Sequence, residues 1–501
     1  MSSLTFARPL PPRARTVSPT IAVSVCILLT AIVIRLGQFG NPIAGLDDQF
    51  YLLVGDRIWS GALPYTDIWD RKPAGLFVVY AAIRALPGDG VLAYQLVGTL
   101  FLALTGVAVA RISAAVVPPL AALAAGVAVV TYGVLLGAGF GEAPVFYDLL
   151  TVIAGACVLA VRAQPRAVRL DVRAAAAMLL CGVALTLKTS AVFESCCFGL
   201  LLLLQDRRGG ASVAVRLMRA AVYLALGLAP TLLIALFYAA NGGWEAFVFA
   251  NLQSAFLRTG GATRDSLARL AGMLILLSPL ILPAAAEWRH IPRDRREVLG
   301  AWLLAGLLSF VAIGRCYEHY ALPLVAPLAL TAAYGFRRRG VVVPFLALAT
   351  IAGGALAVNS GEHARQDRAD FTALLEAVPR EVKTGCLFVY EGPTMLYHLS
   401  GACLPGRYVF PGHFTEPEED GALEYPMADI LKRTLAQRPA VIVSVPELRE
   451  GGEATENDRT LRRELTRAYA IVARQDIRLY GTRRVEAVVW RRKGLASQRK
   501  L

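Results

Sequence analysis

Long apolar runs separated by short polar stretches fill the chain from about residue 20 to residue 358. A hydrocarbon layer of ~30 Å needs ~17–25 apolar residues in a helix, and most of these runs are near that length. Eleven runs are therefore predicted to span a membrane: 21–34, 91–110, 117–138, 145–161, 174–187, 190–204, 220–239, 266–286, 298–313, 319–335 and 341–358. The short stretch 74–87, interrupted by Arg84, is either re-entrant or a further crossing, so we expect eleven to thirteen spans.

The pattern changes after residue 359. Short β-type runs at 386–390, 440–445 and 485–490 alternate with amphipathic stretches at 367–378 and 427–437. This alternation is typical of a small α/β domain. We expect three parts: a segment 1–19, a transmembrane domain 20–359 whose first polar loop is 37–73, and an α/β domain 360–501.

Composition supports a membrane protein, because 56% of the residues are hydrophobic and only 18% are charged. Ordinary soluble domains are ~45–50% apolar and ~25% charged. The net charge of +14 comes largely from arginines in short loops between the apolar runs, at 162–173, 207–219, 289–296 and 337–339.

Cytoplasmic loops collect Lys and Arg, so these loops and the N-terminus are predicted to lie inside. Loop 37–73 and the domain 360–501 are then expected outside. A nucleic-acid partner is not expected, since that would call for a basic face on a soluble domain.

Cys386 and Cys403 both fall in the domain predicted to lie outside, where an oxidising compartment lets thiols pair. We predict a disulfide between them; two unpaired core cysteines are the alternative. Cys316, at the outer end of a span, is predicted to be free.

The densest group of ionisable residues lies in loop 37–73. Asp47 and Asp48 open it, and Asp70-Arg71-Lys72 close it where the chain returns to the membrane. Transfer of a sugar to a hydroxyl needs a general base, which a carboxylate supplies, and cations beside a leaving phosphate. The alternative is a solvated loop whose acids cap a helix and whose basic residues reach the lipid headgroups.

The tract Asp47-Asp48-x-x-Tyr51, followed by Pro64-Tyr65-x-Asp67-x-Trp69-Asp70-x-Lys72-Pro73-x-Gly75, resembles the protein mannosyltransferase and aminoarabinose transferase superfamily, in particular its uncharacterised bacterial branch. These are multi-spanning, family-39-like glycosyltransferases of the GT-C type that use polyprenyl-phosphate sugars. Their first outside loop begins Asp-Glu-x-x-Tyr and ends Lys-Pro-Pro. This chain departs from that pattern at Asp48 and Ala74.

The resemblance implies an α-helical polytopic fold of the GT-C type with a small extracytoplasmic α/β domain. It also implies that Asp47 is the catalytic base, with Asp48 as the second acid, and that Lys72 contacts the donor phosphate beside Arg71. Tyr51, Tyr65 and Asp67 are expected to line the cavity.

Other ionisable residues at membrane depth are costly and are therefore candidates by default. Lys188 and Arg315 are expected to bind the donor phosphate, and Glu142, His319 and Tyr320 to line the cavity. Simpler readings are a lysine that reaches the headgroups and a histidine held by a hydrogen bond. Asn251 and Arg258 are weaker candidates on the acceptor side.

The chain has no phosphate-binding loop motif, no His-Glu-x-x-His pair and no zinc-type cysteine–histidine spacing. These absences argue against an ATP-driven pump and a metalloprotease. No cofactor is expected, although a divalent cation bridging an aspartate and a phosphate stays open.

The function expected is an inverting glycosyltransferase, hexosyl or pentosyl, in a bacterial inner membrane. Its partners would be membrane lipids, a polyprenyl-phosphate sugar donor and a hydroxyl of a glycan, lipid or protein acceptor on the extracytoplasmic face. One alternative is a transporter or flippase of lipid-linked glycans, which predicts inverted repeats and charges at the bilayer midplane. The other is a non-catalytic scaffold of envelope assembly.

Overall fold

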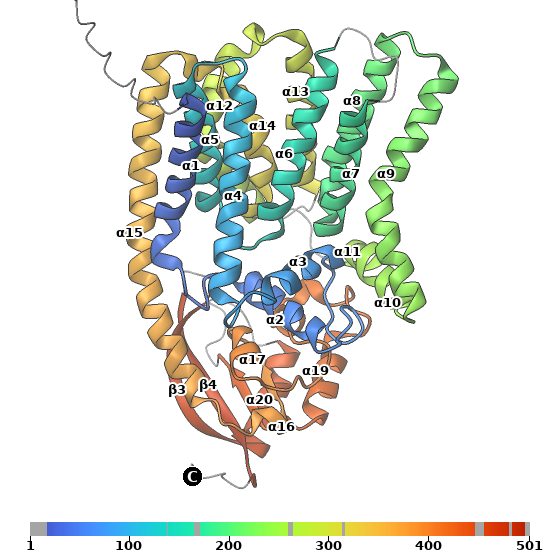
Figure 1. Ribbon diagram of the computed structural model, residues 1–501. Helices are drawn as coiled ribbons and strands as arrows, with labels where there is room; N and C mark the ends of the chain where they lie inside the picture. The colour runs from blue at the N-terminus through green and yellow to red at the C-terminus, as the bar shows by residue number, and fades with distance from the viewer. Residues whose placement is uncertain are drawn as a thin grey trace, which may run out of the picture.

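A computed structural model describes residues 18–137, 139–164, 171–258, 264–312, 316–445, 455–479 and 483–495. It has two layers (Figure 1). Long helices form a bundle, and below it lies a smaller layer that contains a sheet and the C-terminal part of the chain. The short helices α2 (Leu46–Trp59) and α3 (Ala74–Arg84) lie between the two layers.

Each of the eleven predicted spans falls on a helix. By length and composition, the described residues contain seven helices able to cross a membrane, together with shorter apolar helices that include α5 and α7. The multi-pass architecture is therefore confirmed. The bundle helices are α1 (Pro19–Arg35), α4 (Val91–Ala114), α5 (Pro119–Leu135), α6 (Ala143–Arg162), α7 (Val172–Leu187), α8 (Val192–Arg208), α9 (Val213–Ala240), α12 (Arg264–Glu287), α13 (Arg293–Ala312), α14 (Leu322–Ala332) and α15 (Arg339–Ala377).

The ambiguous stretch 74–87 contains α3, which has 11 residues. At 1.5 Å per residue this helix is about 16 Å long, roughly half of the hydrocarbon thickness. It lies against the end of the bundle beside α2 (Figure 1). Helix α3 therefore does not cross a membrane by itself, and it brings the first loop back to the bundle on the side where the loop began.

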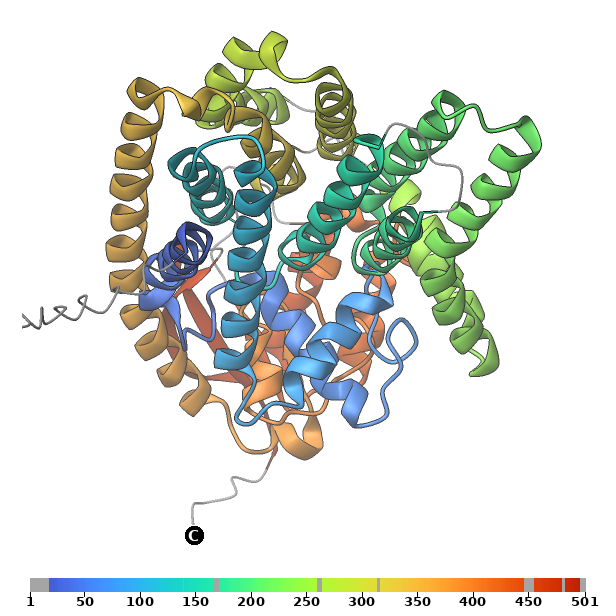
Figure 2. The ribbon, with the colours of Figure 1, turned by 45° about the horizontal axis from the view of Figure 1, so that its top comes forward.

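Helix α15 joins the two layers. Its 39 residues run along one edge of the molecule, opposite α9 (Figure 2). The helix passes residue 359 without a break, and its last turns bury Phe371 and Leu374 beside the sheet. Asp367 on this part accepts a hydrogen bond from Arg478 of strand β3 at 3.1 Å. The two layers are thus held by a continuous helix as well as by side-chain contacts.

The sheet of the lower layer has the order β1-β2-β4-β3, with β1 and β2 parallel and the other pairs antiparallel. Three of its strands, β1, β2 and β4, coincide with the predicted β-type runs. After α15, the lower layer contains the helices and strands α16 (Val382–Gly385), β1 (Leu387–Val389), α17 (Met395–Leu399), α18 (Gly412–Thr415), α19 (Met427–Ala436), β2 (Val441–Ser444), α20 (Glu456–Ala468), β3 (Tyr469–Leu479) and β4 (Arg483–Arg492).

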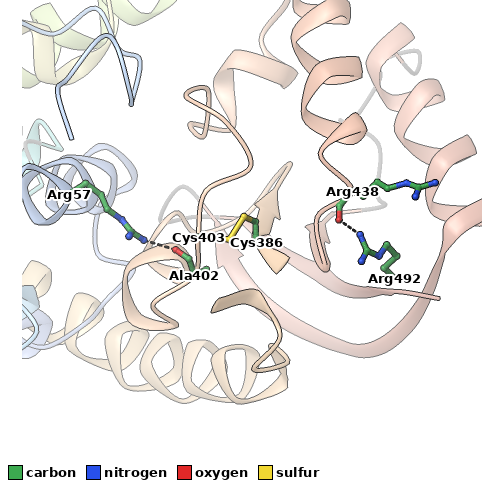
Figure 3. Close-up of a disulfide and its surroundings, with 6 residues drawn as sticks. All are labelled: Arg57, Cys386, Ala402, Cys403, Arg438 and Arg492. Atoms are coloured by element: carbon green, nitrogen blue, oxygen red, sulfur yellow. Dashed lines mark hydrogen bonds between the residues drawn. A yellow bond between two sulfur atoms is a disulfide. The ribbon is translucent and has the colours of Figure 1, made fainter. Parts of the chain in front are cut away.

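The predicted disulfide between Cys386 and Cys403 is present (Figure 3). It joins the residue before β1 to the segment after α17, and Arg57 of α2 donates a hydrogen bond to the neighbouring carbonyl of Ala402. Cys316 is free and buried, as expected. The disulfide-bonded segment thus also contacts the helix on which the first loop's acids lie.

Close helix packing depends on glycine at one point above the site. Gly98 of α4 faces the backbone of Phe140, in the turn between α5 and α6, and a Cβ atom at position 98 would lie 1.7 Å from the Phe140 carbonyl oxygen. A side chain there would have to push this turn away from α4.

We therefore expect Gly98→Ala to destabilise the protein by ~1–3 kcal/mol, the usual effect of overpacking. Gly272→Ala in α12 is the control, because nothing lies within 4 Å of its added Cβ. Thermal unfolding of the purified proteins should show a lower Tm for the first variant only. An equal Tm for both variants would contradict the close contact.

Candidate active site

The first turn of α2 places Asp47 at the boundary between the two layers. Carboxylates in a first helical turn are favoured by the unpaired backbone N–H groups there. The Asp47 side chain is 25% exposed. Its Oδ2 accepts a hydrogen bond of 2.9 Å from the Tyr51 hydroxyl, because residues four apart share one face of a helix.

Lys72, from the other end of the loop, reaches the same point. Its Nζ lies 3.6 Å from Asp47 Oδ2 and 3.9 Å from Asp70 Oδ1. Asp70 also accepts a hydrogen bond from the Lys72 backbone N–H at 2.9 Å. The Tyr65 hydroxyl donates to the Lys72 carbonyl, again at 2.9 Å. The acid that opens the loop and the lysine that closes it are therefore in contact.

Asp48 has a different environment from its neighbour, since it is only 1% exposed. Its Oδ2 accepts a hydrogen bond from the Phe140 backbone N–H at 3.0 Å. A Cβ atom at Gly139 would lie 2.9 Å from the same oxygen, so this turn of the chain approaches Asp48 closely. Asp48 therefore anchors the turn before α6, which ends at Glu142.

Arg35, at the end of α1, is a site residue that sequence reasoning missed. It is buried; its Nη2 donates to the Gly139 carbonyl at 2.8 Å, and its guanidinium lies 4.8 Å from the centre of the Phe140 ring. Its Nη1 has no hydrogen-bond partner in the described part of the chain. The available signal was an arginine at the predicted outer end of a span, against the usual inside preference.

A cavity of about 660 Å³ lies beside this group of residues. Asp47, Asp48, Glu142 and His319 line it, together with Arg35. The lower layer adds Arg478 of β3 to the wall, so the C-terminal part of the chain takes part in the cavity itself.

Lys188, His319 and Tyr320 form a second polar group beside Asp47. Lys188 caps the C-terminal end of α7, and its Nζ lies 4.8 Å from the centre of the Tyr320 ring. The rings of His319 and Tyr320 are 4.4 Å apart, edge to face. Both residues belong to η5 (Glu318–Ala321), the short turn before α14. The structure thus brings the late polar tract to the first loop.

The carboxylates of the site have shifted pKa values. Burial alone would raise the pKa of Asp47, but the charge of Lys72 and the hydrogen bond from Tyr51 hold it below its ordinary value. Burial raises the pKa of Asp48 to about 6. Burial and the charges of Asp47 and Asp48 raise the pKa of Glu142 well above its ordinary value. Asp47 is thus the carboxylate that stays ionised most readily.

Two basic groups of the site, Lys188 and His319, have pKa values below their ordinary ones. Burial lowers the pKa of Lys188 to about 8, and nearby Glu142 opposes this shift. Burial and the charge of Lys188 lower the pKa of His319 to about 4. At neutral pH Lys188 therefore remains largely cationic, whereas His319 is neutral and can only exchange hydrogen bonds.

The side chains of Arg71, Asp67 and Tyr65 mostly contact residues other than Asp47 and Lys72; the exception is the bond from the Tyr65 hydroxyl to the Lys72 carbonyl. Arg71 points to the lower layer, where its guanidinium makes two contacts with the carboxylate of Glu419. Asp67 accepts a hydrogen bond from the Leu63 backbone N–H at 2.7 Å and so closes a local turn. Tyr65 is buried between Phe77 and Tyr238. Arg315 lies outside the described residues.

Asn251 and Arg258 both contact residues of this region. The amide oxygen of Asn251 lies 3.5 Å from the Tyr65 hydroxyl, and Arg258 pairs with Glu416 and Glu419 of the lower layer. Within the described ranges, no group of three or more His, Cys, Asp or Glu side chains is arranged to hold a metal ion.

The fold matches two kinds of solved structure. Crystal structures of ArnT, an aminoarabinose transferase from Cupriavidus metallidurans, have been determined with undecaprenyl phosphate and in the apo state. Each matches with a TM-score of 0.62 and 16% identity, over 93% of this chain and 97% of that chain. An oligosaccharyltransferase from Archaeoglobus fulgidus, tethered to an acceptor peptide, matches with a TM-score of 0.52 and 12% identity, over 85% and 69%.

Both are GT-C proteins. The chain has the GT-C fold. The fold expected from the first-loop motif is therefore confirmed over nearly the whole length of the chain. No protein-family model and no curated protein matches this GT-C chain, so the likeness lies in the arrangement of the helices rather than in the sequence.

His413 is a second buried ionisable group that sequence reasoning missed. It lies in α18 of the lower layer, edge-on to Trp69 of the first loop with 4.9 Å between ring centres. Its Nδ1 has no hydrogen-bond partner among the residues described. Burial lowers the pKa of His413 to about 3, so the folded protein keeps it neutral.

The unfolded chain protonates this histidine near its ordinary pKa of ~6.5, whereas the folded chain does not until about pH 3. The contribution of His413 to stability should therefore fall as the pH falls below about 6.5, by about 2 kcal/mol between pH 7 and pH 5. Between pH 7 and pH 5 the Tm of His413→Phe should fall less than the Tm of wild type. The Tm of His290→Phe, a change at an exposed position, should fall as much as that of wild type. Parallel Tm curves for wild type and His413→Phe would contradict the assignment.

Proposed function

We propose that this protein is a glycosyltransferase that moves a sugar, with inversion, from a polyprenyl-phosphate donor to an acceptor hydroxyl. The observation that carries the proposal is the Asp47 carboxylate, which lines a cavity of about 660 Å³ and lies 3.6 Å from Lys72. The GT-C fold supports this kind of reaction, since both kinds of matching structure are of glycosyltransferases.

In this mechanism Asp47 accepts the proton of the acceptor hydroxyl while the hydroxyl oxygen attacks the anomeric carbon. The bond between that carbon and the phosphate oxygen breaks, and polyprenyl phosphate leaves with the electron pair. The cations of Lys72 and Lys188 stabilise the charge that grows on the phosphate. A phosphate that attracts Lys72 also weakens its contact with Asp47 and so makes the carboxylate a stronger base.

Asp48 and Glu142 take supporting roles. Asp48 is buried and accepts the Phe140 N–H, so we assign it to holding the turn that carries Glu142. Glu142 faces the cavity and favours its protonated form, which suits it to donate a hydrogen bond to the sugar or phosphate. We assign Arg71 no contact with the donor phosphate, because its guanidinium is held by Glu419.

We infer the membrane orientation from the charge of the loops. The arginine-rich loops would lie in the cytoplasm, with the N-terminus, and the cavity and the C-terminal domain 360–501 on the outer face of a bacterial inner membrane. In this orientation the site would lie where lipid-linked sugars meet envelope acceptors. The acceptor would be a hydroxyl of a glycan, a lipid or a protein.

Loss of the base should stop turnover without stopping donor binding. Asp47→Asn is expected to lower the release of polyprenyl phosphate from lipid-linked sugars by about 10²–10⁴-fold, the usual contribution of a general base. Binding of undecaprenyl phosphate to the purified protein should change little. Lys72→Met, in contrast, should weaken that binding.

Asp56→Asn is the matched control, since Asp56 lies on the same helix and its side chain is 29% exposed. It should keep the turnover of wild type. Full activity of Asp47→Asn would reject the proposed mechanism and would favour a transporter or a scaffold, neither of which needs a base at this position.

A further inference from the structure

The end of the first loop is built into the lower layer. Trp69 is fully buried in a cluster with Phe388, Tyr408 and Phe414, all of them residues of the C-terminal part of the chain. Its backbone N–H donates to the Arg407 carbonyl at 2.9 Å. The residues just before Lys72 therefore take their position from the lower layer.

Arg71 continues this attachment through its charge. Its Nη1 lies 2.8 Å from Glu419 Oε1, its Nη2 contacts the other carboxylate oxygen, and its Nε contacts Ser254 Oγ at 3.3 Å. Glu419 is 4% exposed and also pairs with Arg258 at 3.0 Å. Such a bidentate contact fixes the direction of a guanidinium, and burial strengthens its electrostatic component.

Two opposite attachments thus hold one short piece of chain. On one side Tyr65, a loop residue whose ring packs against Tyr238 of α9, donates from its hydroxyl to the Lys72 carbonyl, and on the other side Glu419 of the lower layer holds Arg71. Adjacent side chains in an irregular segment point in different directions, and here Lys72 points to Asp47. In the described structure residues 60–73 form neither a helix nor a strand. The side-chain contacts of this segment therefore position the lysine.

We infer that Glu419 is a positioning residue for Lys72: by holding Arg71, the C-terminal domain keeps the lysine ammonium beside Asp47 and ready for a phosphate. This rests on the proposed function, in which Lys72 binds the donor phosphate. The C-terminal domain then contributes to donor binding through the Glu419 carboxylate and not through contact with the lipid.

The test measures binding of undecaprenyl phosphate to full-length protein in lipid nanodiscs. Arg71→Gln and Glu419→Gln should each weaken binding about tenfold, the kind of loss that follows when a binding group is displaced by a fraction of an ångström. The double variant should be no weaker than either single one, since each change removes the same contact. Glu419→Asp, which keeps the charge, should recover most of the affinity.

Arg491→Gln and Glu381→Gln are matched controls. This pair lies in the same domain, its ion pair measures 3.0 Å, and its side chains are 21% and 17% exposed. Both variants should bind within about twofold of wild type, because their pair does not touch the first loop. The Tm of each variant, measured in parallel, separates a loss of binding from a loss of folded protein.

A second readout is the pH dependence of sugar turnover. With Lys72 displaced, less positive charge faces Asp47, and the pKa of this carboxylate rises. The acidic limb of the rate–pH profile should therefore move to higher pH in Glu419→Gln. A structural role alone would lower Tm and leave this limb in place. The inference is overturned if the Glu419 and Arg71 variants bind undecaprenyl phosphate as the controls do while Lys72→Met still loses it. If Lys72→Met also binds normally, the proposed function itself fails.

Discussion

The ion pair between Asp47 and Lys72 is the interaction on which the site depends. Each partner comes from one end of a loop of more than twenty residues, and both would be costly at the edge of a hydrocarbon layer without an opposite charge. Their contact closes the first loop over the end of the bundle. It also leaves one carboxylate and one ammonium beside a large cavity, the two groups that the proposed mechanism uses to activate a hydroxyl and to receive a phosphate.

Helical geometry divides the work between the two neighbouring acids. Successive residues of an α-helix point about 100° apart, so Asp47 and Asp48 cannot face the same surroundings. Asp47 faces Tyr51 and Lys72, whereas Asp48 is buried against the Phe140 N–H. One carboxylate stays ionised and reachable, and the other fixes the turn that leads to Glu142. The pair therefore gives one accessible carboxylate and one buried anchor.

The lower layer belongs to the site as much as the bundle does. Arg478 forms part of the cavity wall, Trp69 is buried in the core of the lower layer, and Glu419 holds Arg71. Helix α15 runs unbroken from the bundle into this layer, so no linker divides the two parts at residue 359. This architecture makes the C-terminal domain a support for the first loop rather than a loosely attached cover.

Periodicity and charge in the sequence determined the parts of the structure that depend on local chemistry. Apolar runs of membrane length marked each of the eleven bundle helices, and the run of β-type residues marked three of the four strands. Strand β3 escaped notice because Arg474, Asp476 and Arg478 interrupt its apolar pattern. An edge strand with a solvent-facing side tolerates such residues. The disulfide was predictable because both cysteines fall in the part of the chain that the charge pattern assigns to an oxidising compartment, where thiols pair.

Only the tertiary structure decided which of the charged residues act together. The motif named Asp47, Asp48, Arg71 and Lys72 as one group, but the fold turned Asp48 inward and Arg71 toward Glu419, more than three hundred residues later in the chain. It also brought in Arg35 and His413, which no motif marks. The physical reason is that a side chain's partner is set by long-range packing. A sequence records which groups carry charge, whereas the folded chain determines which of them are buried together and must neutralise one another.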